Sequence, residues 1–218
     1  MKILTYLLSL SFLVLTGCQS TQTANTEFKH IFNGKDFTGW RATFNPGSFK
    51  IKDGILVVNS TGNGPNLLYM GDDLNKKYKD FELVVEAKAE PNSNSGIYFH
   101  TDGTSRTYKG WLHNGYEAQL NSTEKEKRKT GSLYGIQDVA KSPVDETEWF
   151  TMRIKVKGKR IQVWVNDTQT ADYTEPNNVE RPKNRIGRLL SDDGGYIGIQ
   201  AHDLKSKWYF KTVKIREI

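Results

Sequence analysis

The chain has 218 residues, of which 36% are hydrophobic and 11% aromatic. This fits one globular domain, or a domain with an appendage, and argues against a disordered chain. Its single cysteine excludes an internal disulfide framework and a cysteine-based zinc site. The formal net charge of +6 is modest and spread along the chain, so no nucleic-acid partner is expected.

The N-terminal residues have the pattern of an export signal. Lys2 supplies a positive charge, and the apolar run over residues 3–15 is shorter than the about 20 residues of a membrane-spanning helix. Leu15-Thr16-Gly17-Cys18 resembles the bacterial lipoprotein box, in which the cysteine is acylated and becomes the new N-terminus. We therefore expect a lipoprotein signal peptide over residues 1–17; an ordinary signal with an incidental Cys18 is the alternative.

The residues after Cys18 extend this expectation to a place in the cell. Residues 18–27 are predicted to comprise the acylated cysteine and a flexible, polar tether. Gln19 and Ser20 directly after the cysteine, by the same resemblance, imply the outer membrane of a Gram-negative cell envelope.

The remainder, residues 28–218, alternates between apolar and polar residues with the period of β-strands. Strands are predicted over residues 81–88, 96–101, 115–120, 152–157, 161–165, 196–202 and 210–217, with a hairpin turning near Gly158. No window of helical periodicity appears, so we expect an all-β domain, a two-sheet antiparallel jelly-roll sandwich closed by its last strand beside an early one. Two stretches break the pattern: residues 124–129, interpreted as a solvated loop tip, and residues 174–188, rich in Pro, Asn and charge.

Residues 115–121 carry the strongest candidate for chemistry. In a strand, Glu117, Gln119 and Asn121 share one face, and Tyr116, Ala118 and Leu120 share the other. A face made of a carboxylate and amides suits the floor of a polar cleft. Retaining glycosidases need two carboxyl groups about 5–5.5 Å apart, and this strand offers one, so double displacement is disfavoured there. The alternative is that Glu117 is a solvated sheet residue.

Three further segments offer polar side chains. Asn94 and Ser95 either donate to a sugar hydroxyl or serve only a turn. Tyr134 is either a phenol beside the cleft or a core residue, and Gln200 and His202 share one strand face. The four histidines show no metal-ligand spacing, so no cofactor is predicted, while a metal assembled from distant residues stays open.

A set of short segments occurs in a characteristic order. They are Phe32-Asn33-Gly34-Lys35-Asp36, Gly39-Trp40, Asp80-Phe81-Glu82-Leu83, Asn94-Ser95-Gly96-Ile97-Tyr98-Phe99, Gly115-Tyr116-Glu117-Ala118-Gln119, Gly131-Ser132-Leu133-Tyr134-Gly135, Glu148-Trp149, Gly198-Ile199-Gln200-Ala201-His202 and Phe210-Lys211-Thr212-Val213-Lys214-Ile215. In this order they resemble the 3-keto-disaccharide hydrolase family, and the likeness covers residues 30–218. The chain departs from the family's usual pattern at His100, Asn121 and Asp203, which bears on substrate preference.

The resemblance implies a concanavalin-A-like fold and cleavage of a disaccharide or glycoside whose glucose ring carries a ketone at C3. The ketone acidifies the proton on C2, and its removal gives an enolate that expels the C1 oxygen, after which water adds to the enone. Such a route needs a base, a donor to the enolate oxygen and an acid. We assign proton transfer to Glu117 and His202. The predicted substrate contacts are Gln119, Asn94, Ser95, Tyr134, Gln200, His100 and Trp111.

Two other functions fit the same residues. A non-catalytic, lectin-like lipoprotein would stack sugar rings on tryptophans such as Trp111 or Trp164. A hydrolase of unoxidised glycans would need a second acid from loop residues such as Asp102, Asp192 or Asp193. In each case the expected partners are a carbohydrate and, through the lipid anchor, a membrane, and a monomer is expected.

Overall fold

The strands and two short 3-10 helices of this domain are defined by a computed structural model that describes residues 27–62, 64–105 and 110–218. The elements are β1 (Lys29–His30), β2 (Trp40–Ala42), η1 (Pro46–Ser48), β3 (Phe49–Lys52), β4 (Ile55–Asn59), β5 (Asn66–Tyr69), β6 (Phe81–Ala89), β7 (Asn94–Thr101), β8 (Tyr116–Asn121), β9 (Phe150–Lys157), β10 (Arg160–Val165), β11 (Thr168–Thr174), η2 (Lys183–Arg185), β12 (Tyr196–Gln200) and β13 (Lys207–Glu217). The predicted signal peptide and nearly all of the predicted tether lie outside the described residues. Within the described residues, no helix has the length and apolar composition needed to cross a membrane.

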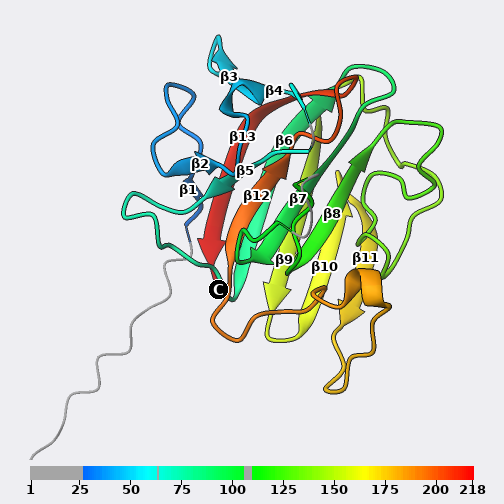
Figure 1. Cartoon of the computed structure of the whole chain (residues 1–218). Helices are drawn as coiled ribbons and strands as arrows, with labels where there is room; N and C mark the ends of the chain where they lie inside the picture. The colour runs from blue at the N-terminus through cyan, green and yellow to red at the C-terminus, as the bar shows by residue number, and fades with distance from the viewer. Residues whose placement is uncertain (1–26, 63, 106–109) are drawn as a thin grey trace, which may run out of the picture.

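The strands form two antiparallel sheets packed face to face (Figure 1). One sheet has the order β11-β10-β9-β6-β13-β4-β3, with β1 also paired to β13, and the other has the order β2-β5-β12-β7-β8. The predicted all-β jelly-roll sandwich of concanavalin-A type is thus confirmed. The last strand, β13, pairs with both β4 and β6, as expected for a chain that closes beside its early strands.

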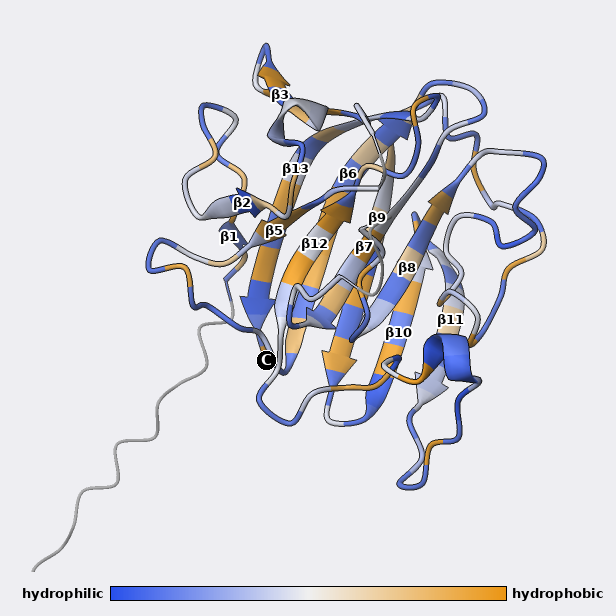
Figure 2. Ribbon diagram, in the orientation of Figure 1, coloured by the Kyte–Doolittle hydropathy of each residue, from blue (hydrophilic) through white to orange (hydrophobic). Residues whose placement is uncertain are grey.

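Alternation of side chains along the strands builds the core between the sheets. Figure 2 shows apolar and polar residues alternating along β8 and β10. The apolar set faces inward and is almost fully buried, with Trp40, Phe81, Phe99, Trp208 and Phe210 among its largest members. The β9–β10 hairpin turns at Gly158, whose φ of +54° is costly for residues other than glycine.

The strand β7 is buried along its whole length, so its outward face is covered as well as its inward face. On β8, all six residues are buried too. The cover on the outward side comes from loops, and these loops enclose a polar site over the five-stranded sheet.

Candidate active site

The outward face of β7 and β8 forms the floor of the site. Glu117 and Gln119 point away from the core on β8, while Tyr116, Ala118 and Leu120 pack into it. Across the strand pair, Tyr98 lies opposite Glu117 and Gly96 lies opposite Gln119. The floor is therefore a carboxylate, an amide and a phenol, with a glycine that leaves space between them.

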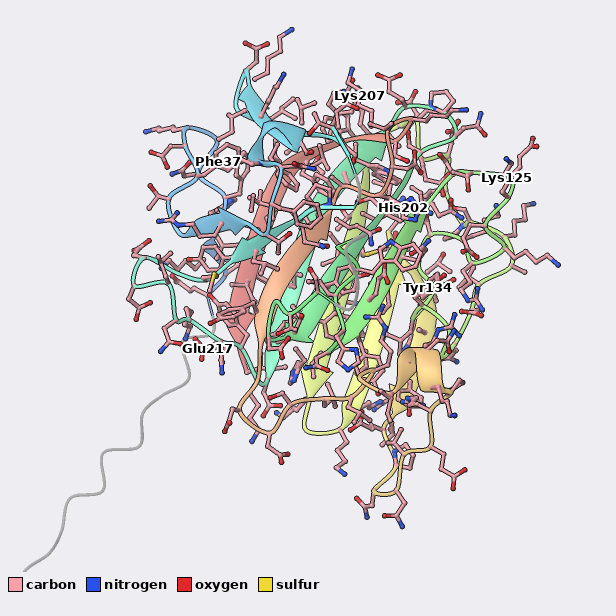
Figure 3. All side chains as sticks on the ribbon, viewed as in Figure 1. Phe37, Lys125, Tyr134, His202, Lys207 and Glu217 are labelled. Atoms are coloured by element: carbon pink, nitrogen blue, oxygen red, sulfur yellow. The ribbon has the colours of Figure 1, made fainter. Side chains whose placement is uncertain are left out.

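A cavity of about 180 Å³ lies over this floor. Its lining consists of Tyr98, Trp111, Glu117, Gln119, Tyr134, Asn184, Arg185, Arg188, Gln200 and His202. Both residues assigned to proton transfer from sequence, Glu117 and His202, thus line one cavity. Tyr134 and His202 lie on the same side of the five-stranded sheet in Figure 3.

Glu117 is held in place by a glycine below it and an arginine beside it. A Cβ atom at position 96 would lie 2.5 Å from Oε1 of Glu117, so the carboxyl group occupies the space that the missing side chain of Gly96 leaves. Arg188 donates from Nη2 to Oε2 of Glu117 over 3.1 Å, and each side chain is only 5% exposed. Burial raises the pKa of Glu117, and the charge of Arg188 opposes that rise. The carboxyl group is thereby tuned toward the range in which proton transfer is useful.

Tyr98 connects this pair to the neighbouring strand. Gln200 donates from Nε2 to the Tyr98 hydroxyl over 3.1 Å, and that hydroxyl is also hydrogen-bonded to Glu117 and to Arg188. Burial and the negative charge of Glu117 raise the pKa of Tyr98, so the phenol stays protonated. The network fixes the orientation of the carboxyl group before substrate enters.

His202 follows β12 and is oriented by its neighbour in the chain. Its Nδ1 donates to Oδ2 of Asp203 over 2.8 Å, which leaves Nε2 for other partners. Burial alone would raise the pKa of Asp203, but the hydrogen bonds from His202 and from the Lys205 backbone outweigh it, so the pKa of Asp203 is lowered. A carboxylate that orients an imidazole is the usual support of a histidine that transfers protons.

Tyr134 and Arg185 form the side of the cavity next to the edge of β8. The backbone N–H of Tyr134 donates to the Glu117 carbonyl, so the segment runs along the free edge of the strand. The Arg185 guanidinium lies 5.3 Å from the centre of the Tyr134 ring, a cation–π distance, and also lies against Gly135. The Tyr134 hydroxyl donates to Oε2 of Glu126 over 3.2 Å. Residues 124–129 are therefore not only a solvated loop tip, because Glu126 turns inward from it.

Two amide oxygens in the cavity have no partner within the described part of the chain. Oε1 of Gln119 and Oε1 of Gln200 are both buried without a hydrogen bond. Buried acceptors without a partner are rare because they cost free energy. Both residues line the cavity, so these two acceptors belong to its polar floor.

Three of the residues predicted as substrate contacts lie elsewhere. Asn94 accepts a hydrogen bond from Nε2 of Gln119 and so orients that amide from outside the cavity lining. Ser95 donates to the Gln200 carbonyl and is fully buried. His100 lines a separate cleft, where Nδ1 accepts from the Ser191 N–H and Nε2 lies 2.9 Å from the Lys79 carbonyl. We therefore assign none of the three to direct substrate contact.

The sequence-based prediction missed the arginines. Tyr98 lies in a predicted strand but was not among the predicted site residues. Arg188, Arg185 and Asn184 come from the irregular stretch over residues 174–188. Long irregular loops in compact domains are commonly functional, so the length of this stretch could have indicated that it contributes to the site. Long-range contacts hold this stretch, such as those of Arg181 with the hydroxyls of Tyr116 and Tyr173. These contacts determine which arginine of the stretch pairs with Glu117.

No metal site accompanies this arrangement within the described ranges, where no group of three or more His, Cys, Asp and Glu side chains gathers closely enough to hold an ion.

Comparison with protein families gives a match over nearly the whole domain. The model of the 3-keto-alpha-glucoside-1,2-lyase-like domain matches residues 27–216. The chain belongs to this family. A segment of 74 residues is 39% identical to the 3-keto-disaccharide hydrolase of Bacteroides thetaiotaomicron, and it makes up 32% of this chain and 26% of that protein. The chain thus matches about a quarter of the length of that relative.

Solved structures agree with the fold of the lyase-like family. The crystal structure of a candidate glycosyl hydrolase from Parabacteroides distasonis superimposes with a TM-score of 0.71 at 24% identity, covering 88% of this chain and 94% of that one. A carbohydrate-binding module from Bacillus subtilis, CBM66, gives a TM-score of 0.57 at 14% identity, covering 84% and 98%. At these identities the likeness concerns the fold.

Proposed function

We propose that this chain cleaves the glycosidic bond of 3-keto-glycosides, including 3-keto-disaccharides, through an enolate intermediate formed at the cavity over β8. The observation that carries the proposal is the charge of the cavity. Two guanidinium groups, of Arg185 and Arg188, line it together with one carboxyl group, that of Glu117.

The sign of this charge separates two kinds of glycoside cleavage. Ordinary glycosidases pass through a transition state with positive character on the sugar ring and use two carboxyl groups. An enolate is negative, and fixed cations and hydrogen-bond donors stabilise it. In the described lining of the cavity, Glu117 is the sole acid. The lining includes none of the aspartates that could have supplied a second acid, Asp102, Asp192 and Asp193. The cavity is therefore suited to a negative intermediate.

Glu117 is assigned as the base in the first step. Its carboxylate takes the proton from C2, and the electrons of the C2–H bond form the enolate, with negative charge on the C3 oxygen. Arg188 and Arg185 supply positive charge for that oxygen. The Tyr98 hydroxyl holds the carboxylate in place throughout.

His202 is assigned as the acid in the second step. The enolate re-forms the C3 ketone, a C1–C2 double bond appears, and the C1–oxygen bond breaks. The departing oxygen takes the proton of Nε2 of His202, whose ring is oriented by the hydrogen bond from Nδ1 to Asp203. Water then adds at C1 after giving a proton to His202, and Glu117 returns its proton to C2, which completes hydrolysis.

Cleavage of a 3-keto-disaccharide, prepared chemically, tests the proposal against its unoxidised parent. Wild-type protein should cleave the oxidised sugar and leave the parent intact. Removal of a general acid or base costs about 10²- to 10⁴-fold, so Glu117→Gln and His202→Asn should lose activity by that range. Full activity of Glu117→Gln would refute the assignment. Cleavage of the parent, or binding without turnover, would favour a conventional hydrolase or a lectin-like protein.

We also propose that the enzyme acts at the cell envelope as a lipoprotein. The support is the sequence before the domain: a short apolar run after Lys2 and the lipoprotein-like box that ends at Cys18. Acyl chains on that cysteine would hold the domain at a membrane.

A further inference from the structure

A second and larger cleft adjoins the catalytic cavity. Its volume is about 840 Å³, and His202 lines both spaces. One wall is the turn after β12, with Asp203, Leu204 and Lys205, and the other is the loop after β8 at residues 123–126. We call this space the outer cleft.

Both walls of the outer cleft are fixed by hydrogen bonds. Oδ1 of Asp203 accepts from the N–H groups of Lys205 and Ser206, over 2.9 and 3.1 Å, which closes the turn. The side-chain amide of Asn121 donates to the carbonyls of Glu126 and Arg128, over 3.0 and 2.8 Å, which holds the opposite loop. The outer cleft is therefore formed without a ligand.

The wall beside His202 exposes an apolar side chain. Leu204 is 70% exposed, the most exposed of the large hydrophobic residues within the described ranges. A single exposed leucine needs no explanation by itself. This one lines the outer cleft two residues after the proposed acid, so it lies where part of a ligand would pass.

The described lining of the outer cleft carries charges of both signs, two lysines and three carboxylates. Lys125 and Lys205 are exposed on its walls, and Glu124, Glu126 and Asp203 line it with them. The mixture favours neither an anionic nor a cationic ligand, so an uncharged group fits best.

We infer that the outer cleft is the subsite for the leaving group of the substrate, and that it selects an uncharged, bulky group with an apolar face. The inference rests on the proposed function. His202 gives its proton to the glycosidic oxygen, so that oxygen lies next to His202. The inner cavity of about 180 Å³ is the smaller of the two spaces and holds the oxidised sugar ring. The leaving group, which is bonded to the other side of the glycosidic oxygen, then extends past His202 and contacts Leu204.

Two 3-keto-glucosides with leaving alcohols of similar acidity and different size test this. The ethyl glycoside ends before the outer cleft, and the 2-cyclohexylethyl glycoside reaches into it. Apolar contacts with a substrate are worth about tenfold or more in kcat/KM, so Leu204→Ser should lose about that factor for the bulky glycoside alone. Leu204→Met should keep the wild-type ratio. Leu74→Ser, at an exposed leucine in the loop between β5 and β6, is the matched control and should change neither value.

The outcomes separate the two proposals. If wild-type protein cleaves both glycosides and Leu204→Ser leaves their kcat/KM ratio unchanged, the leaving-group assignment is wrong and the proposed function stands. If wild-type protein cleaves neither, the proposed function is wrong, and the assignment of the outer cleft is wrong with it.

Discussion

At the scale of single residues, Glu117 is an acid whose negative charge is destabilised by burial. It is almost fully buried, and its stabilisation comes from Arg188 and from the Tyr98 hydroxyl. Losing one partner of a buried ion pair leaves the other without compensation, which typically costs about 3–5 kcal/mol. The pair is therefore better explained by catalysis than by stability, because an apolar pair of similar volume would pack there at lower cost.

The raised pKa of Glu117 predicts how stability depends on pH. A carboxyl group whose pKa in the folded protein lies above its unfolded value stabilises the fold at pH values below the unfolded pKa. That contribution disappears as pH rises through the folded pKa. Wild-type protein should therefore gain stability relative to Glu117→Gln as pH falls through this window, by about 1.4 kcal/mol per unit of pKa difference. Urea unfolding of both proteins from pH 4 to pH 8 measures it, and a loss of wild-type stability relative to Glu117→Gln as pH falls would contradict it.

At the scale of elements, the site depends on the pairing of β7 with β8. Glu117 and Gln119 reach the same cavity because they are two residues apart on one strand. Gly96 on β7 has no positive φ, so the backbone would tolerate alanine, and its role is to leave space for the carboxyl group of Glu117.

Gly96→Ala should displace that carboxyl group and lower activity without unfolding the protein. An added Cβ would come within 2.5–3.1 Å of three atoms of Glu117. A misplacement of about 1 Å in a catalytic group costs about 100-fold in rate, and we expect a loss of kcat/KM of that size. Gly47→Ala, where no atom lies within 4 Å of the new Cβ, is the control. Equal activity of the two variants would show that Gly96 does not position Glu117.

Strand periodicity explains which parts of the site the sequence could predict. Alternation is local, so the shared face of Glu117 and Gln119 followed from spacing alone. His202 lies beyond the end of β12 and lines the same cavity as Gln200. The same alternation argues against Ser95 as a substrate contact, because Ser95 follows Asn94 directly on β7 and points to the opposite face. His100 has a φ of +56°, which interrupts the alternation and directs its ring to backbone groups of Lys79 and Ser191.

Loops follow no such rule. Arg188 lies in a segment held by long-range contacts, among them the N–H of Leu190 on the carboxylate of Glu175. Spacing in the sequence does not encode these contacts. The cation that pairs with Glu117 could therefore be found only from the structure.

At the scale of the whole molecule, the first strand and the cavity belong to different sheets. The cavity lies on the outward face of the five-stranded sheet. The chain enters the domain through β1, which pairs with β13 in the other sheet, with Lys29 opposite Ile215. If Cys18 is acylated, the tether predicted over residues 18–27 leads into the sheet that does not carry the cavity.

Acylation at Cys18 is directly measurable. Cells that express the full chain and are fed an alkyne-bearing fatty acid should label the wild-type protein, and Cys18→Ala should remain unlabelled. The single cysteine makes the comparison unambiguous. Labelling of both proteins, or of neither, would contradict the lipoprotein assignment.

The central claim is that Glu117 removes the proton from C2 before the glycosidic bond breaks. A 3-keto-glucoside carrying deuterium at C2 tests it most directly, through the isotope effect on kcat/KM against the unlabelled sugar. The enolate route predicts a primary isotope effect well above unity, because the C2–H bond is broken on the way to cleavage. Cleavage of the labelled and unlabelled sugars at equal rates would contradict the account.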